Sequence, residues 1–138
     1  MNLLKKIDAR RERAAHVNKL ITSIASYGRK FFWSAEYARC AHIEVDALGL
    51  VWFHDEHTGA RIYTHYIPFR RTWSGFSHRG TLLGLVELMR DYIVTGKRIP
   101  MHFIAPMSIN YDAWGYGRVA AYELHVAAAR NPAVTTSR

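Results

Sequence analysis

The stretch that decides the fold runs from His42 to Ile67 and reads HIEVDALGLVWFHDEHTGARIYTHYI. Its first part alternates, so that Ile43 and Val45 point to one side of a strand and their polar neighbours to the other. Leu50–His54 is a short, almost wholly apolar run that suits a buried strand. Asp55–Gly59 has the length and the final glycine of a hairpin loop, and alternation resumes after it. The stretch therefore predicts an antiparallel meander of three strands.

The residues on either side of this stretch extend the predicted β region to residues 30–69. Upstream, the aromatic run Phe31–Trp33 suits a strand, so three or four strands are expected. Downstream, Pro68 ends the alternating run or marks an edge strand.

Helical periodicity surrounds the β region. Apolar residues recur at spacings of three and four from Leu3 to about Ser26, and Gly28 is a natural stop. Thr81–Thr95 carries a wide apolar stripe and ends at Gly96, while Arg118–Arg130 is rich in alanine and stops before a proline. The expected fold is α+β, with an N-terminal amphipathic helix, the meander, and two further helices packed on the sheet.

The remaining segments complete a single expected domain over residues 1–132. Met101–Ala105 is predicted to be extended, Pro106–Gly117 to be a loop, and residues 133–138 to be a disordered tail. The long basic helix over residues 1–26 has two interpretations. It either covers the sheet, or it projects and pairs with a second copy to form a homodimer.

The amino-acid composition says more about the kind of partner that this protein binds than about any activity. The chain has 138 residues and a formal net charge of +8, a balance that favours polyanions such as nucleic acid. Cys40 is the only cysteine, so no intrachain disulfide can form, and a buried structural thiol in a reducing cytosol is expected. No apolar run approaches the roughly 20 residues of a membrane span, and the charged N-terminus lacks the apolar core of a secretory signal.

Two segments that contain glycine precede the later helices, Ser77-His78-Arg79-Gly80-Thr81-Leu82 and Trp114-Gly115-Tyr116-Gly117. In the first, either Ser77 or Thr81 caps the helix, or Arg79 and the backbone bind an anion. In the second, the rings either pack into the core, which is the favoured interpretation, or stack on a base.

Arginines and aromatic residues are interleaved between Arg61 and Arg79, a composition typical of surfaces that follow phosphates or anchor a protein partner. The linker that leads into Ser77 is expected at the surface, and the N-terminal helix is expected to supply a second basic face. The predicted contact residues are Arg61, Arg70, Arg71, Trp73, His78, Arg79, Lys5, Arg11, Arg13 and Lys19.

The hairpin loop also contains metal-binding residue types. His54 and His57 flank Asp55 and Glu56, and two imidazoles with two carboxylates can hold a divalent ion. A hairpin tip is ordinarily exposed, and the spacing matches no catalytic motif. No metal or cofactor is therefore predicted, and His54 and His57 are kept only as candidates. The sequence also lacks a phosphate-binding loop, a dinucleotide fingerprint and a nucleophile elbow.

The pattern SHRGTL at 77–82, RDYI at 90–93 and WGYG at 114–117 resembles one found in small accessory proteins of tailed phages, prophages and plasmids. The resemblance covers about residues 66–120. It implies a mobile-element accessory protein that works in the cytoplasm of a bacterial host, and it implies no catalytic residues.

Together these features predict a non-enzymatic protein that binds nucleic acid or a host nucleic-acid-handling complex, and that could thereby inhibit a bacterial defence system as anti-CRISPR proteins do. Two alternatives stay open. One is a regulator that binds DNA or RNA directly, and the other is a metal-dependent nuclease that uses the histidine-rich hairpin. No membrane partner is expected.

Overall fold

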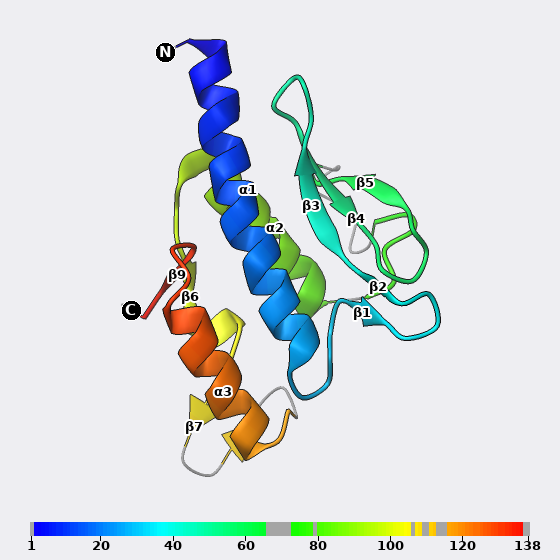
Figure 1. Ribbon diagram of the computed structural model, residues 1–138, viewed down its shortest axis with the longest axis vertical. Helices are drawn as coiled ribbons and strands as arrows, with labels where there is room; N and C mark the ends of the chain where they lie inside the picture. Colours follow the sequence, from blue (N-terminus) through cyan, green and yellow to red (C-terminus); the bar gives the residue numbers. More distant parts are fainter. Residues whose placement is uncertain are drawn as a thin grey trace.

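The computed structural model describes residues 2–65, 73–78, 80–105, 107–108, 111–112 and 116–136. Its centre is a long helix, α1 (Leu3–Ser26). A small antiparallel sheet lies on one side of α1, a second helix lies behind it, and a third helix with a short strand pair lies on the other side (Figure 1). The predicted α+β class is confirmed.

Helix α1 begins and ends as the sequence predicts. The side chain of Asn2 caps its first turn by accepting a hydrogen bond from the backbone N–H of Leu4 at 2.8 Å. Its apolar stripe faces the sheet and both other helices, which makes α1 the core element of the domain. The buried residues of α1 are Ile7, Ala14, Val17, Leu20, Ile21, Ile24 and Ala25.

The three-stranded meander is confirmed. Strands β3 (His42–Val45), β4 (Val51–His54) and β5 (Arg61–Tyr63) pair antiparallel in that order. Phe53 lies opposite Ile43 on one neighbour and Ile62 on the other, and all three side chains are buried. One face of the sheet therefore packs into the core, while the opposite face carries polar and aromatic side chains.

The aromatic run Phe31–Trp33 does not extend this sheet, which corrects the strand prediction. Phe32 has a φ of 69° and its side chain is fully buried, whereas Trp33 is 37% exposed. Only β1 (Trp33–Ser34) is extended, and it pairs with β2 (Arg39–Cys40) in a separate two-stranded hairpin. The left-handed backbone at Phe32 lets one ring enter the core while the next ring turns outward.

Helix α2 (Thr81–Thr95) has the predicted bounds, and Gly96 ends it in the left-handed conformation with a φ of 82°. Capping by Ser77 or Thr81 is not observed, because the N-cap is Gly80 and no side-chain hydrogen bond caps the helix. The predicted stripe is buried, and it packs α2 against α1 and β4.

Helix α3 (Arg118–Ala129) is confirmed, but it packs on α1 rather than on the three-stranded sheet. Two predictions next to it are wrong. Residues 101–103 form a 3₁₀ helix, η1 (Met101–Phe103), instead of an extended piece. The predicted loop that follows contains a short antiparallel pair, β7 (Met107–Ser108) and β8 (Tyr111–Asp112).

The expected disordered tail also contains structure. Strand β9 (Val134–Thr135) pairs in parallel with β6 (Ile99–Pro100), and Ala133 and Val134 are fully buried. The backbone N–H of Ile99 donates to the carbonyl of Ala133 at 2.7 Å, so residues 133–135 are held against the segment that follows α2.

Tyr116 of the WGYG segment is a core residue, as the favoured interpretation predicts; Trp114 and Gly115 lie outside the described residues. Its hydroxyl donates to the carbonyl of Ile104 at 3.1 Å, and its ring meets Phe31 edge-on at 5.8 Å. The backbone of Gly28, just after α1, lies directly against it.

We expect Gly28→Ala to destabilise the fold by about 2 kcal/mol. The added methyl group would lie 2.6 Å from Cβ of Tyr116, and Gly28 has a φ of 56°. Gly84→Ala is the matched control, because this helical glycine has open space around it and should stabilise the fold by about 0.5 kcal/mol. Urea unfolding measures both variants, and equal effects would contradict the described contact.

Candidate functional site

The structure separates the residues predicted to contact a partner. Arg70, Arg71 and Arg79 lie outside the described residues. Trp73 is 5% exposed and packs edge-on against Phe76, so its predicted surface role is wrong. A large aromatic ring gains more from the core than from solvent, and this gain decides its position.

Arg61 is exposed but already paired. Its Nε lies 3.0 Å from a carboxylate oxygen of Glu44, and its guanidinium stacks over the ring of Trp52 at 3.8 Å. The hydrogen bond from Arg61, followed by that from His54, holds the pKa of Glu44 below its usual value. Arg61 is therefore a component of the outer sheet face rather than a free cation.

The predicted basic face of α1 is also interrupted. Arg13 donates to the carbonyl of Ile93 at 2.8 Å, which joins α1 to the end of α2. Lys5, Arg11 and Lys19 are exposed, but Lys5 and Lys19 are about 21 Å apart along the helix. The acidic residues Asp8 and Glu12 are exposed between them. The helix therefore presents mixed charge along most of its length.

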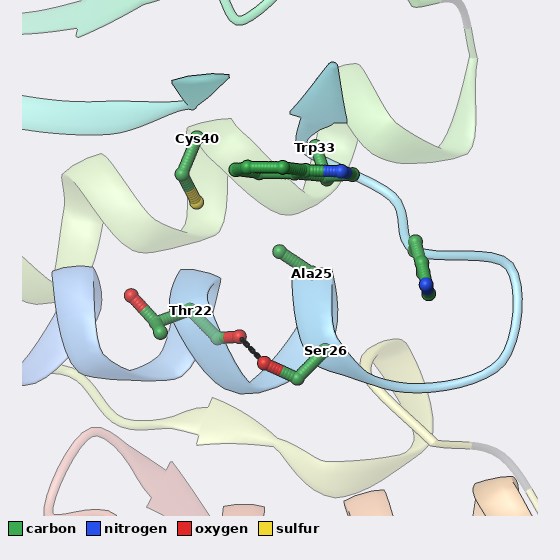
Figure 2. Close-up of a pocket in the computed structure, with 6 residues that line it drawn as sticks. Thr22, Ala25, Ser26, Trp33 and Cys40 are labelled. Atoms are coloured by element: carbon green, nitrogen blue, oxygen red, sulfur yellow. Dashed lines mark hydrogen bonds between the residues drawn. The ribbon is translucent and has the colours of Figure 1, made fainter. Parts of the chain in front are cut away.

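A pocket of about 450 Å³ lies between the last turns of α1 and the β1–β2 hairpin (Figure 2). One wall is the flat indole of Trp33 with the thiol of Cys40 beside it, and the opposite wall is α1 (Figure 2). Its volume is in the range typical of sites for small molecules. The lining residues are Thr22, Ala25, Ser26, Lys30, Trp33 and Cys40.

The shape of this pocket suits a flat ring. In Figure 2 the indole of Trp33 lies edge-on to the viewer and above the small side chain of Ala25. Ser26 uses its hydroxyl to bond the carbonyl of Thr22 at 2.7 Å, so it adds no unpaired donor to that wall. The indole of Trp33 is 37% exposed and forms a wall of the pocket, so a flat ring that enters the pocket can stack on it.

Lys30 is the cation that lines the pocket, and further cations are close to its lining residues in the sequence. Arg29 and Lys30 are exposed directly after α1, and Lys19 lies one helical turn before Thr22. The guanidinium of Arg39 stacks over the exposed ring of Tyr37 at 5.1 Å and also donates to the backbone carbonyls of Glu56 and His57 at 2.9 and 3.2 Å. Against these, Glu36 is the exposed acid of the hairpin. We name the set of Lys19, Arg29, Lys30, Trp33, Tyr37 and Arg39 the Trp33 surface.

Cys40 is half-buried at the edge of the pocket rather than fully buried. Burial, and then the nearby carboxylate of Glu56, raises the pKa of its thiol. A thiol with a raised pKa is mostly protonated near neutral pH, which makes Cys40 a poor nucleophile.

The first predicted metal candidate, His54, has another partner. Its Nε2 lies 2.7 Å from a carboxylate oxygen of Glu44, and its ring stacks on His42 with 4.3 Å between centroids. Burial, and then the charge of His54, holds the pKa of His42 below its usual value. These two histidines belong to the polar network of the outer sheet face.

Asp46 anchors the same network. Its carboxylate accepts hydrogen bonds from the backbone N–H groups of Leu48 and Leu50 and from the indole N–H of Trp52, each at 2.9 Å. The bond from Trp52 contributes most to holding the pKa of Asp46 below its usual value.

Because its folded-state pKa is lowered, Asp46 stabilises the fold above the unfolded-state pKa, and this stabilisation is lost as the pH falls below about 4. We expect Asp46→Ala to cost about 1.5 kcal/mol near neutral pH and much less near pH 3. Urea unfolding at both pH values measures the difference. Asp8→Ala, which removes an exposed acid of α1, is the control, and an equal cost at both pH values would refute the role of Asp46.

The second metal candidate, His57, lies in a different group. Glu56, His57 and His78 place one potential ligand atom each within 4.8 Å of one another. His78 was predicted as a partner contact, whereas its Nε2 lies 2.5 Å from the buried carboxylate of Glu56. Glu56 and His78 are 22 residues apart, so no local sequence signal indicates this contact.

The architecture and the Trp33 surface define a small basic α+β protein. No helix in the described part of the chain is long and apolar enough to cross a membrane. The chain belongs to the YoqU family, whose model matches residues 8–129.

One relative is the SPbeta prophage-derived uncharacterized protein YoqU of Bacillus subtilis (strain 168). It is 31% identical over 86 residues, which cover 62% of this chain, and the chain spans 61% of the length of that relative. No solved structure matches the chain. The prophage origin of the relative agrees with the resemblance to accessory proteins of mobile elements.

Proposed function

We propose that this protein is a phage accessory protein that binds single-stranded nucleic acid through the Trp33 surface, in the cytoplasm of the bacterial host. The supporting family evidence is the match to YoqU and its prophage-derived member. The observation that carries the proposal is the exposed indole of Trp33, which walls a pocket beside Lys30.

The Trp33 surface suits single-stranded nucleic acid because it offers both a ring for stacking and cations for phosphate contacts. A base can stack on an aromatic ring whatever its sequence, and cations beside the ring can follow the backbone of the strand. In a duplex the bases are already stacked on one another, so the pocket should favour single strands.

The distribution of acidic residues supports a basic surface here. Glu44, Asp46, Asp55 and Glu56 are turned toward internal partners in the sheet and the hairpin loop. On the β1–β2 hairpin itself, several cations lie near the single exposed acid Glu36 among the described residues of that hairpin. Nucleic acid is the polyanion that such a combination of cations and rings fits best.

The proposal predicts binding that weakens steeply with salt. With about three phosphate contacts on a single strand, the affinity should fall roughly 20-fold between about 50 and 200 mM salt. Fluorescence anisotropy with labelled single-stranded DNA and RNA measures this, and a duplex of the same sequence is the comparison. A flat salt response or a preference for the duplex would contradict the proposal.

A host complex that handles nucleic acid is the other partner to test. If this protein bound the nucleic acid of such a complex, it would inhibit a defence system that depends on it. A pull-down from host lysate with and without nuclease treatment separates the two cases. The proposal predicts that bound host proteins disappear after nuclease treatment. Retention of one complex after treatment would instead indicate a direct protein target.

A further inference from the structure

We propose that Glu56, His57 and His78 bind one divalent transition-metal ion, with Zn²⁺ as the representative ion. The cluster lies at the junction between the β4–β5 hairpin loop and the segment that precedes α2. None of its three residues lines the pocket walled by Trp33, so this inference does not depend on the proposed function.

The potential donor atoms of the three residues already lie close together. Nε2 of His78 lies 2.5 Å and Nε2 of His57 lies 3.8 Å from the same carboxylate oxygen of Glu56. Two donors on one zinc ion at about 2.1 Å can be no more than about 4.2 Å apart. The donors of the cluster lie within 4.8 Å of one another, so small side-chain movements bring them into range.

Glu56 brings a buried carboxylate to the cluster. The side chain of Glu56 has no exposed surface, and its Oε1 has no hydrogen-bond partner among the described residues. A buried carboxylate oxygen without a partner is costly, and an ion is one of the groups that removes this cost. The exposed loop tip predicted from the sequence is therefore wrong for Asp55 and Glu56, which face inward.

The cluster is held in place before any ion binds. Asp55 accepts hydrogen bonds from the backbone N–H groups of His57 and Ser77, which joins the two segments. The imidazole of His78 packs edge-on against Phe32 and Phe76, with centroids 5.7 and 5.6 Å away. Two of the three donors are thus fixed, and His57, whose side chain is 45% exposed, can close onto an ion.

The donor set selects the class of ion. Two imidazole nitrogens and one carboxylate suit Zn²⁺, Co²⁺ or Ni²⁺, whereas Mg²⁺ and Ca²⁺ prefer oxygen donors. Three protein ligands also leave a coordination position open, as in zinc sites that bind water or substrate. Without an ion, His78 and Glu56 form a hydrogen-bonded pair, which is the competing explanation.

Calorimetric titration of the full chain with Zn²⁺, together with the visible absorption of bound Co²⁺, tests the proposal. We expect one ion per chain and a tetrahedral Co²⁺ spectrum. His57→Ala should weaken Zn²⁺ binding by at least about tenfold without unfolding the protein, because this side chain is largely exposed. His78→Ala should also abolish the Co²⁺ spectrum, and circular dichroism establishes that each variant is folded.

His54→Ala is the matched control, since it removes a histidine of the same hairpin that contacts Glu44 instead of the cluster. Its Zn²⁺ affinity should stay within about twofold of the unchanged protein. If the unchanged chain does not bind Zn²⁺, or if His57→Ala and His54→Ala weaken binding equally, the proposal is wrong and the cluster is only a hydrogen-bonded pair of His78 and Glu56.

Discussion

Replacing Asp55 by alanine should lower the free energy of unfolding by about 4 kcal/mol, because its buried carboxylate accepts several charge-assisted hydrogen bonds. The backbone N–H groups of His57 and Thr58 donate to one oxygen at 2.9 Å, and that of Ser77 donates to the other at 2.6 Å. Burial alone would raise the pKa of Asp55, but these hydrogen bonds outweigh burial and lower it. The residue therefore joins the β4–β5 loop to the segment before α2 as an ionised group.

Two further variants make this prediction specific. Asp55→Asn keeps an oxygen that can accept from His57 and Thr58 but loses the acceptor for Ser77, so it should cost roughly half as much. Glu36→Ala removes an exposed acid and should change stability by less than about 0.5 kcal/mol. Urea unfolding near neutral pH measures all three, and equal values for Asp55→Ala and Glu36→Ala would contradict the described junction.

The elements that could be predicted from the sequence are those whose signals are local. The apolar stripe of Leu3–Ser26 and the glycine that ends Thr81–Thr95 fix both helices within a few turns of chain. The alternation of Ile43 and Val45 likewise identifies a strand with one buried face. The bounds of these elements could be predicted because each bound depends on residues that are close together in the sequence.

The elements that could not be predicted depend on distant contacts. Phe32 adopts a left-handed backbone because its ring fits beside Phe53 in the core, which no local pattern reveals. Val134 lies among small and polar residues that are typical of a disordered tail. It is nevertheless buried, because its strand pairs with the strand that contains Ile99, 35 positions upstream. Trp73 is buried against Phe76 although arginines precede it in the sequence.

The candidate sites show the same division. The hairpin histidines could be named from composition, but only the fold assigns His54 to Glu44 and brings His78 to Glu56. A contact surface made of aromatic rings and cations was expected between Arg61 and Arg79. In the structure, an exposed ring lies beside a cation at Trp33. The sequence could have indicated this earlier segment, because Arg29, Lys30 and Trp33 stand close together directly after a helix.

Trp33→Ala should weaken the binding of a single-stranded oligonucleotide by about 10- to 100-fold, the loss typical of removing a stacking platform. The indole is 37% exposed and walls the pocket, so its removal takes away the surface on which a base would lie. The fold should remain intact, since the buried ring of this segment is Phe32 and not Trp33. Lys30→Ala should give a smaller loss and should also reduce the dependence of affinity on salt.

Tyr122→Ala is the matched control for the aromatic ring. Tyr122 is 61% exposed on α3, beside a different pocket that includes the acidic Glu123. Its removal deletes an exposed ring without changing the Trp33 surface, so it should leave the affinity within about twofold.

The most direct test of the account is therefore the affinity of the unchanged chain, Trp33→Ala and Tyr122→Ala for one labelled single-stranded oligonucleotide, measured side by side by fluorescence anisotropy. The account predicts a loss of at least about tenfold for Trp33→Ala and nearly unchanged binding for Tyr122→Ala. Equal affinities for Trp33→Ala and the unchanged chain, or no binding by the unchanged chain, would contradict it.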